Sequence, residues 1–285
     1  MEWYIQQSKL IEKSDWNSQI NDLKNNTIKG TLLPVLTDAV KKRITKENAV
    51  LFSGGIDSTI IALLLQKLGA NFKCYTVGFQ DSNFKKPEDI VWAKKVAKEL
   101  GFVLESKIFT LNEMKKIFIR TVNILGKHAN VVTVGVGSVI IAANLGNEKN
   151  WFSGLGSEEI FAGYERHKQN PANEECWNGL ISMYKRDLIR DSIIAKKLGI
   201  TISTPFLDKE LIRTAMNIPI EMKIKGDNNK IVLREAAIQL GMPKEFAMRK
   251  KRAAQYGSSF DRALAKLAKI SGFKYKKDYI ESLRQ

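Results

Sequence analysis

The chain has 285 residues, of which 44% are hydrophobic and 27% charged, a composition typical of a globular protein with one large core or two modest ones. Its longest nearly uncharged stretch, residues 130–146, is broken by Gly, Thr, Ser and Asn, so we expect no membrane span, and the N-terminus shows no signal-peptide pattern. With two histidines and two cysteines but no CxxC pair, a disulfide framework and a zinc site are excluded. This cysteine usage predicts a cytoplasmic protein.

The order of the predicted elements indicates a doubly wound α/β fold. After an N-terminal arm and loop over residues 1–30, hydrophobic periodicity and turn residues predict a helix at 32–43, strand 49–52, helix 58–68, strand 72–79, helix 87–100, strand 102–109, helices 111–125 and 135–145, strand 151–152 and a helix start at 158–164. From Trp177 onward the pattern is helical apart from turns. This alternation predicts a parallel sheet with its ligand at the carboxyl ends of the strands. We expect an arm and lead-in helix (1–48), an α/β core (49–170) and a C-terminal helical subdomain (171–285).

The connection after the first core strand has the composition of a phosphate-binding loop. It reads Ser53-Gly54-Gly55-Ile56-Asp57-Ser58 and leads directly into an apolar helix. Glycines let the backbone approach a ligand, and the N–H groups of the first helical turn attract an anion. Asp57 is unsuited to direct phosphate binding but suited to Mg²⁺. A Gly-Gly pair alone would indicate only a turn, whereas the whole string resembles the pyrophosphate loop of the N-type ATP pyrophosphatases. Walker and dinucleotide glycine patterns are absent from the sequence.

A second motif narrows the resemblance. Residues 153–164 read Ser-Gly-Leu-Gly-Ser-Glu-Glu-Ile-Phe-Ala-Gly-Tyr, which is similar to the Ser-Gly-x-Gly-x-Asp-Glu-x-Phe-x-Gly-Tyr signature of the synthetase domain of asparagine synthetases and the related β-lactam synthetases. Further matches in the same order lie at 36–43, 76–79, 205–208, 233–235 and 249–251, so the resemblance covers about residues 32–259. It implies the adenine nucleotide alpha hydrolase-like (HUP-type) sheet.

The sequence departs from that family on the side of the acceptor substrate. Leu155 stands where asparagine synthetases have Glu, and it can neither move a proton nor accept a hydrogen bond. Glu158 replaces the first Asp, which still permits Mg²⁺ binding. The Glu-x-Arg before Pro205 has become Thr201-Ile202-Ser203, and the sequence contains no glutaminase domain.

The resemblance implies an AMP-forming carbon–nitrogen ligase that adenylates a carboxylate, aspartate by family default, and transfers ammonia or an amine to it. ATP and Mg²⁺ are the implied cofactors, with Asp57 and Glu158 as metal ligands and Lys251 and Glu159 as catalytic residues. For Glu159, a structural carboxylate at a helix start is an equal alternative. The residues implied to bind ATP are Leu51, Ser53, Gly54, Gly55, Asp57, Ser58, Val77, Gly78, Gly154 and Lys250.

The net charge of +16 leaves a second function open. Residues 241–285 contain 12 Lys and Arg against 4 Asp and Glu, so they contribute half of the excess. Such a tail attracts polyanions, and Phe273, Tyr275 and Tyr279 among its lysines could stack on RNA bases. The alternatives are therefore an adenylating enzyme acting on RNA or tRNA, and a nucleotide-binding protein without catalysis; a solvated lysine-rich surface explains the charge equally well. A separate glutaminase subunit is a further expected partner.

Overall fold

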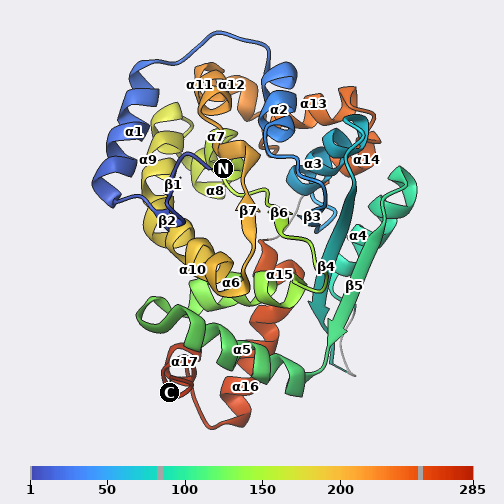
Figure 1. Cartoon of the computed structure of the whole chain (residues 1–285), viewed down its shortest axis with the longest axis vertical. Coiled ribbons are helices and arrows are strands. Elements are labelled where there is room, and N and C mark those ends of the chain that lie inside the picture. Colours follow the sequence, from blue (N-terminus) through green and yellow to red (C-terminus); the bar gives the residue numbers. More distant parts are fainter. Residues whose placement is uncertain (1, 82–85, 250–252, 285) are drawn as a thin grey trace.

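The computed structural model describes residues 2–81, 86–249 and 253–284, and its centre is a five-stranded parallel sheet (Figure 1). The strand order is β5-β4-β3-β6-β7. The strands are β3 (Asn48–Leu51), β4 (Phe72–Phe79), β5 (Leu104–Phe109), β6 (Asn150–Phe152) and β7 (Thr201–Ser203). Because the first strand in the chain lies in the middle and later strands are added on either side, the sheet is doubly wound, which confirms the predicted fold class.

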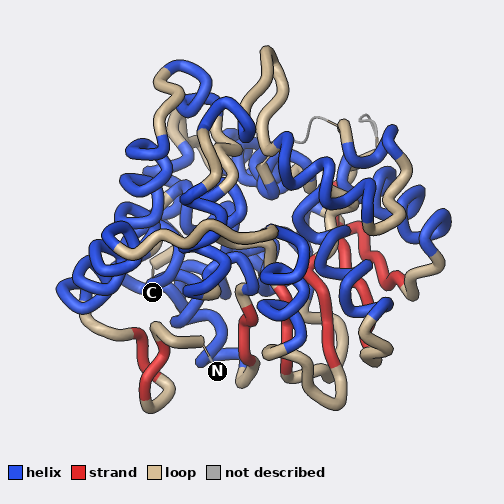
Figure 2. Tube along the Cα trace, turned by 90° about the horizontal axis from the view of Figure 1, so that it is seen from above, coloured by secondary structure: helices blue, strands red, loops and turns tan. Residues whose placement is uncertain are grey.

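Alternating side chains of the strands build two cores, one on each face of the sheet. Val50 and Cys74 face one core, whereas Ala49 and Tyr75 face the other. The strands β3, β4 and β6 are therefore mostly buried on both faces, as in other parallel sheets, whereas the edge strand β5 is exposed from Ser106 to Ile108. Seen from above, helices lie on both sides of the strands (Figure 2).

Eight of the helices belong to the face of Val50. They are α1 (Lys13–Asn25), α2 (Leu32–Lys41), α3 (Ile56–Lys67), α4 (Glu88–Leu100), α7 (Ser157–Ile160), α9 (Asn173–Met183), α11 (Lys209–Asn217) and α13 (Ile231–Gln239). Helix α3 is buried from Ile56 to Leu65, because it lies between the sheet and helices α2 and α13. A helix that is apolar on all sides, as the sequence 60–65 is, requires such a central place.

The opposite face is covered by α5 (Leu111–Leu125), α6 (Val131–Ala143), α10 (Ile189–Leu198), α16 (Phe260–Ile270) and α17 (Lys276–Ser282). Helix α6 begins at Val131, four residues earlier than expected, because the side chain of Asn130 accepts hydrogen bonds from the backbone N–H groups of Val132 and Thr133. Short helical turns complete the described chain: η1 (Gly126–His128), α8 (Glu165–Gln169), the π-helical η2 (Tyr184–Leu188), η3 (Pro205–Leu207), α12 (Ile220–Lys223), α14 (Lys244–Ala247) and α15 (Ala254–Gly257).

Two parts of the predicted architecture were wrong. The expected N-terminal arm and loop is instead a hairpin, β1 (Ile5–Gln6) with β2 (Lys9–Leu10), followed by α1. That helix buries Trp16, which stacks on Trp3 with ring centroids 5.0 Å apart. The purely helical reading after Trp177 missed β7, which pairs with β6 through Ile202 and Trp151.

No helix in the described part of the chain is long and apolar enough to cross a membrane.

Candidate active site

The predicted phosphate loop connects the carboxyl end of β3 to the first turn of α3. The Oγ of Ser53 accepts from the backbone N–H of Gly55 at 3.3 Å, and the Oγ of Ser58 donates to the carbonyl of Gly55 at 3.2 Å. Gly54 has a φ of +65°, and a Cβ on it would lie 2.8 Å from the backbone nitrogen of Ala93 in α4. Only glycine therefore lets the loop fold closely against α4. This geometry suits an anion at the helix N-terminus.

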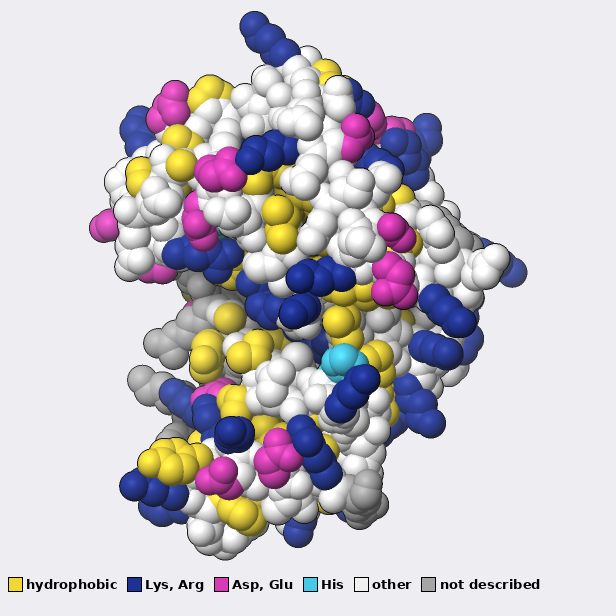
Figure 3. Space-filling view, turned by 90° about the vertical axis from the view of Figure 1, so that its left-hand side faces the viewer, with side chains coloured by type: hydrophobic (Ala, Val, Ile, Leu, Met, Phe, Trp, Pro, Cys, Tyr) yellow, Lys and Arg dark blue, Asp and Glu magenta, His cyan; other side chains and the backbone are white. Residues whose placement is uncertain are grey.

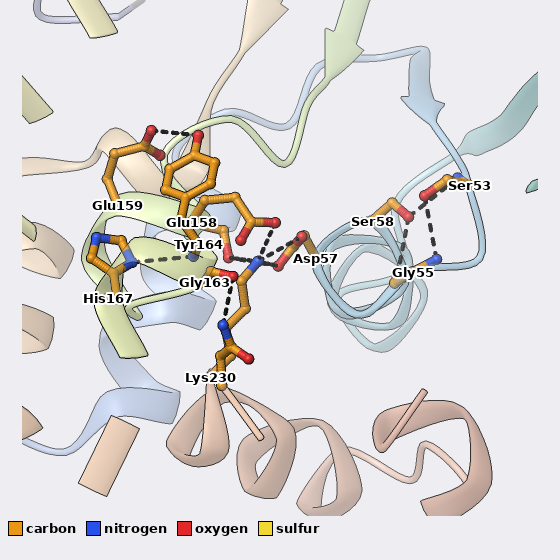
Figure 4. A network of polar contacts seen from close by, with 12 residues as sticks. Ser53, Gly55, Asp57, Ser58, Glu158, Glu159, Gly163, Tyr164, His167 and Lys230 are labelled. Carbon is orange, nitrogen blue, oxygen red and sulfur yellow. Dashed lines mark hydrogen bonds and ion pairs between the residues drawn. The ribbon is translucent and has the colours of Figure 1, made fainter. Parts of the chain in front are cut away.

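Asp57 and Glu158, the two predicted metal ligands, share one cation in the structure (Figure 4). The Nζ of Lys230 lies 2.8 Å from Oδ1 of Asp57 and 2.9 Å from Oε1 of Glu158. It also lies 3.2 Å from the Oγ of Ser157, which donates to Asp57 at 2.6 Å. Burial by itself lowers the pKa of the Lys230 ammonium, but the two carboxylates outweigh burial and raise that pKa above its ordinary value.

Two glycines of the second motif permit this arrangement. A Cβ on Gly154 would lie 2.8 Å from the Cβ of Asp57, so glycine lets the second loop approach the first. A Cβ on Gly163 would lie 1.7 Å from Oε2 of Glu158 and 2.4 Å from Cε of Lys230. The packing of the two carboxylates and the lysine therefore explains Gly154 and Gly163 of the motif.

The donor set fits a magnesium ion bound together with a nucleotide. Asp57 and Glu158 place one oxygen each within 3 Å of a common point, the ammonium of Lys230. In the described residues, no group of three or more His, Cys, Asp or Glu side chains is positioned to hold a metal. Two carboxylates with substrate phosphates supplying further oxygens are a usual environment for Mg²⁺.

Glu159 points away from this cation site. Only 1% of its surface is exposed, and its Oε1 accepts from the Tyr164 hydroxyl at 2.9 Å and from Arg186 at 2.6 Å. Figure 4 shows its carboxylate on the far side of the loop from Asp57. Burial raises the pKa of Glu159, against the opposing charge of Arg186. The geometry favours the structural alternative, while its catalytic role stays a prediction.

The remaining predicted ATP-binding residues line the strand ends. Leu51 is the half-buried last residue of β3, and Val77 is buried near the end of β4. A Cβ on Gly78 would lie 2.6 Å from Cγ of Pro87, so this glycine permits the approach of α4. Leu155, at the altered acceptor position, is partly buried against the core.

Lys250 and Lys251 lie outside the described residues. The segment before them is held in place by Arg234, whose guanidinium donates to the carbonyls of Ala247 and, at 3.1 Å, Arg249. Arg249 in turn pairs with Glu88 at 3.0 Å, and its guanidinium lies 4.7 Å from the ring of Trp92. The guanidinium of Arg234 therefore donates to backbone carbonyls, including that of Asn229 at 2.7 Å.

Sequence reasoning missed Lys230, Ser157 and Arg186. Lys230 has a φ of +57° at the start of α13, where a bulky residue is rarely found. Lys230 lies three residues before the matched string Leu233-Arg234-Glu235, which is about one helical turn. Extending that match toward the N-terminus would therefore have included Lys230. Arg186 lies in the π-helical turn η2 and carries no motif of its own.

Comparison with known proteins identifies the family of this chain. A family model described as asparagine synthase matches residues 31–180 and 168–272, which covers most of the sequence. The chain belongs to the asparagine synthase family. The resemblance inferred from the two glycine motifs is thereby confirmed.

Individual relatives match at modest identity. The chain is 28% identical to a candidate glutamine-hydrolysing asparagine synthetase of Methanocaldococcus jannaschii, covering 88% of this chain and 53% of that protein. It is 27% identical to the asparagine synthetase of Gallus gallus, covering 90% and 46%, and 28% identical to asparagine synthetase B of Escherichia coli, covering 83% and 46%. The chain thus spans about half the length of these relatives. Among solved structures, the NMN synthetase of Francisella tularensis aligns with a TM-score of 0.41 at 12% identity, over 96% of this chain and 93% of that one.

Proposed function

We propose that this protein is an AMP-forming carbon–nitrogen ligase that activates a small carboxylate with ATP and then transfers ammonia or an amine to it. Membership of the asparagine synthase family supports ATP-dependent amidation. The single observation that supports the position of the chemistry is the shared cation between Asp57 and Glu158 beside the phosphate loop. A site that neutralises a polyphosphate next to N–H donors is what pyrophosphate departure requires.

The first half-reaction follows from the loop. An oxygen of the carboxylate substrate attacks the α-phosphorus of ATP, the bond to the β-phosphate oxygen breaks, and pyrophosphate leaves, so that an acyl-adenylate remains. The backbone N–H groups around Gly55 and the hydroxyls of Ser53 and Ser58 would bind the leaving pyrophosphate. Mg²⁺, when bound by Asp57 and Glu158, would supply positive charge to the phosphates. In the second half-reaction the amine attacks the acyl carbon, and AMP leaves.

Lys230 has a defined part in this scheme. Like charges in a buried site repel each other. Before a nucleotide binds, the ammonium of Lys230 therefore offsets the repulsion between the carboxylates of Asp57 and Glu158. A flexible lysine side chain can then turn toward the phosphates while the carboxylates take up their ligand. The second loop closes over this lysine through Asn229, whose side chain donates to the carbonyl of Gly163 at 2.7 Å.

We propose a small carboxylate as the acceptor substrate, and aspartate is the first candidate. Leu155 removes a polar group from the second motif, and β7 carries Thr201 and Ser203 where the family has charged side chains. Both changes lie on the acceptor side, whereas the phosphate side retains its hydroxyls and carboxylates. A substrate whose recognition needs charge at these positions is disfavoured.

Exchange of labelled pyrophosphate into ATP tests this proposal, because it reports adenylate formation without the nitrogen source. Each reaction contains MgATP and one carboxylate from a panel led by aspartate and glutamate, and AMP is then measured after ammonium is added. We expect exchange that depends on one carboxylate, loss of exchange in Asp57→Asn, and no loss in Asp227→Asn, an exposed turn residue. Release of ADP and phosphate, or binding of MgATP without exchange across the panel, would contradict the proposal; the latter would favour a nucleotide-binding protein without catalysis.

A further inference from the structure

Five helices form a layer on the sheet face opposite α3, and we name α5, α6, α10, α16, α17 and their connections the basic layer. They pack directly against one another, α5 and α6 side by side, with α16 and α17 following (Figure 1). The layer is assembled from three distant stretches of sequence, residues 111–143, 189–200 and 260–284. Its charge is therefore not a property of the C-terminal segment alone.

The charge of the protein is concentrated in this layer. Its five helices contain 11 Lys and Arg against 5 Asp and Glu, and Lys127, Lys274 and Arg284 between and after the helices add three more cations. The eight helices on the opposite face contain 10 Lys and Arg against 13 Asp and Glu. A lysine-rich composition alone would charge both faces equally, so the asymmetry requires a local cause.

The layer contains cations that are available to an outside partner. Six of them are exposed, and none of the six lies within 4.0 Å of a carboxylate in the part of the chain that the structure describes: Lys115, Lys116, Arg120, Lys127, Lys196 and Lys197. Figure 3 shows Lys and Arg side chains gathered across the middle of the face that lies to the left in Figure 1, at the height of α10.

The layer is not built to enter a bilayer. Helix α5 turns Met114, Phe118 and Val122 inward, and α16 turns Phe260 and Leu264 inward. An interfacial membrane helix presents its apolar stripe to the lipid, whereas these helices present their cations to solvent. The exposed ring of the layer is Tyr275, 59% exposed, with the Nζ of Lys274 5.3 Å from the ring centre. A ring beside unpaired cations is the arrangement that binds a stacked base and its phosphate.

The layer also meets the edge of the sheet where the nucleotide loop lies. The backbone N–H of Phe79, the last residue of β4, donates to the carbonyl of Ser258 at 2.9 Å, two residues before α16 begins. Lys266 of α16 forms an ion pair with Asp81, just beyond the end of β4. A polyanion on the layer would therefore extend toward the carboxyl ends of the strands.

We propose that the basic layer is a docking surface for single-stranded RNA, including an RNA loop. The phosphates of the RNA bind the exposed cations of α5, η1 and α10, and a base of the RNA stacks on the ring of Tyr275. The inference does not depend on the proposed ligase activity, since it uses none of the residues around Asp57. It also extends the expected RNA contact from the C-terminal segment to a composite surface with α5 and α10.

Fluorescence anisotropy with a labelled RNA of about 16 nucleotides tests the proposal, using the full chain at several salt concentrations. If about five phosphates are contacted, log K falls against log salt with a slope of about −3.5. The triple variant Lys115→Gln, Lys116→Gln, Arg120→Gln should weaken binding at least tenfold and reduce the slope by about 2. The matched variant Lys67→Gln, Lys94→Gln, Lys98→Gln removes the same charge from exposed positions of α3 and α4, and it should bind like the wild type.

Three outcomes would overturn the proposal: equal losses in the two triple variants, no measurable RNA binding, or tighter binding to phosphatidylserine vesicles than to RNA. Tyr275→Ala should weaken RNA binding while leaving the salt slope unchanged, because it removes stacking and not charge. Thermal unfolding of both triple variants shows whether weaker RNA binding results from loss of the folded state and not from loss of charge. Carboxylate-dependent pyrophosphate exchange should persist in both, so that failure of RNA docking and failure of the ligase proposal remain distinguishable.

Discussion

The ammonium of Lys230 lies 2.8 Å from the carboxylate of Asp57, although 173 residues separate them in the chain. Lys230 directly precedes α13 and Asp57 lies in the first turn of α3, so the contact joins the starts of two helices that are distant in sequence. Both side chains are at least 90% buried. A buried charge without a partner is strongly unfavourable, so each of the two residues determines the cost of changing the other.

Replacing Lys230 by Met should destabilise the nucleotide-free protein. The variant leaves Asp57 buried beside Glu158 without a counter-charge, and breaking a buried pair in this way costs about 3 kcal/mol or more. Urea unfolding measures this difference. Lys225→Met, five residues away and exposed, is the matched control and should unfold like the wild type.

The double variant Asp57→Asn, Lys230→Met completes a thermodynamic cycle. Because it removes both charges, it should be more stable than Lys230→Met alone, with a coupling free energy of about 1 to 3 kcal/mol. Additive effects of the two changes would show that the ion pair is not coupled in solution.

Gly163→Ala should disable the cation site while the fold persists. The new methyl group would overlap Oε2 of Glu158 and Cε of Lys230, both on flexible side chains that can move aside. Displacing a carboxylate from its position should weaken Mg²⁺-dependent ATP binding by about 10- to 100-fold. Calorimetric titration with MgATP measures this loss. Gly30→Ala is the control, since its Cβ would meet Thr214 only at 3.4 Å, an ordinary contact; equal ATP affinities in the two variants would contradict the argument.

The phosphate side of the site could be predicted from sequence because its residues are adjacent in the chain. Ser53, Gly55, Asp57 and Ser58 form one turn between a strand and a helix, and local spacing fixes their relative positions. Asp57 and Glu158 could be expected to meet because both motifs follow neighbouring parallel strands, β3 and β6.

Lys230 could not be found in the same way. Its position depends on the packing of α13 against α3 and on a positive φ, neither of which hydrophobic periodicity reports. Strand β7 was missed for a related reason. It is three residues long, and its pairing with β6 is decided by the sheet edge and not by the propensity of Thr-Ile-Ser. Part of the arm and loop expected over residues 1–30 is instead helix α1, whose stability comes from burial of Trp16, Ile20 and Leu23.

Glu158→Gln and Glu159→Gln should differ although they are neighbours. Glu158 is 37% exposed on its side chain and contacts the ammonium of Lys230, whereas Glu159 is buried against Tyr164 and Arg186. We expect Glu158→Gln to lower the rate of pyrophosphate release at least 100-fold. Glu159→Gln should retain activity within about tenfold, since an amide oxygen can still accept from Tyr164. A larger loss in Glu159→Gln would assign it the catalytic role.

Acid should destabilise the protein through His167. This side chain is buried, and its Nδ1 accepts from the backbone N–H of Tyr164 at 3.1 Å. Burial lowers its pKa from an ordinary value of 6.5 to about 4. The unfolded state therefore binds more protons between these values, and the free energy of unfolding falls by about 2 kcal/mol from pH 6.5 to pH 5. The loss should be smaller in His167→Gln, and unchanged in the control His128→Gln.

Lys223 should make stability rise on the alkaline side. Its side chain is fully buried, and its Nζ donates to Oδ1 of Asn173 at 2.9 Å. Burial lowers the pKa of this ammonium from an ordinary value of 10.5 to about 8. Between these values the unfolded state binds more protons, so the contribution of Lys223 to the free energy of unfolding increases as the pH rises from 8 toward 10.5, by up to about 3 kcal/mol.

The difference between wild type and Lys223→Met isolates this effect from other groups that titrate in the same range. At pH 7.5 the variant should be the more stable protein, because the wild type keeps a charge in an apolar site. The gap should narrow by pH 10, where the folded wild type has released that proton. Urea unfolding at the two pH values measures the gap, with Lys46→Met as an exposed control. A gap that does not change with pH would mean that the ammonium stays charged in the folded protein over this range.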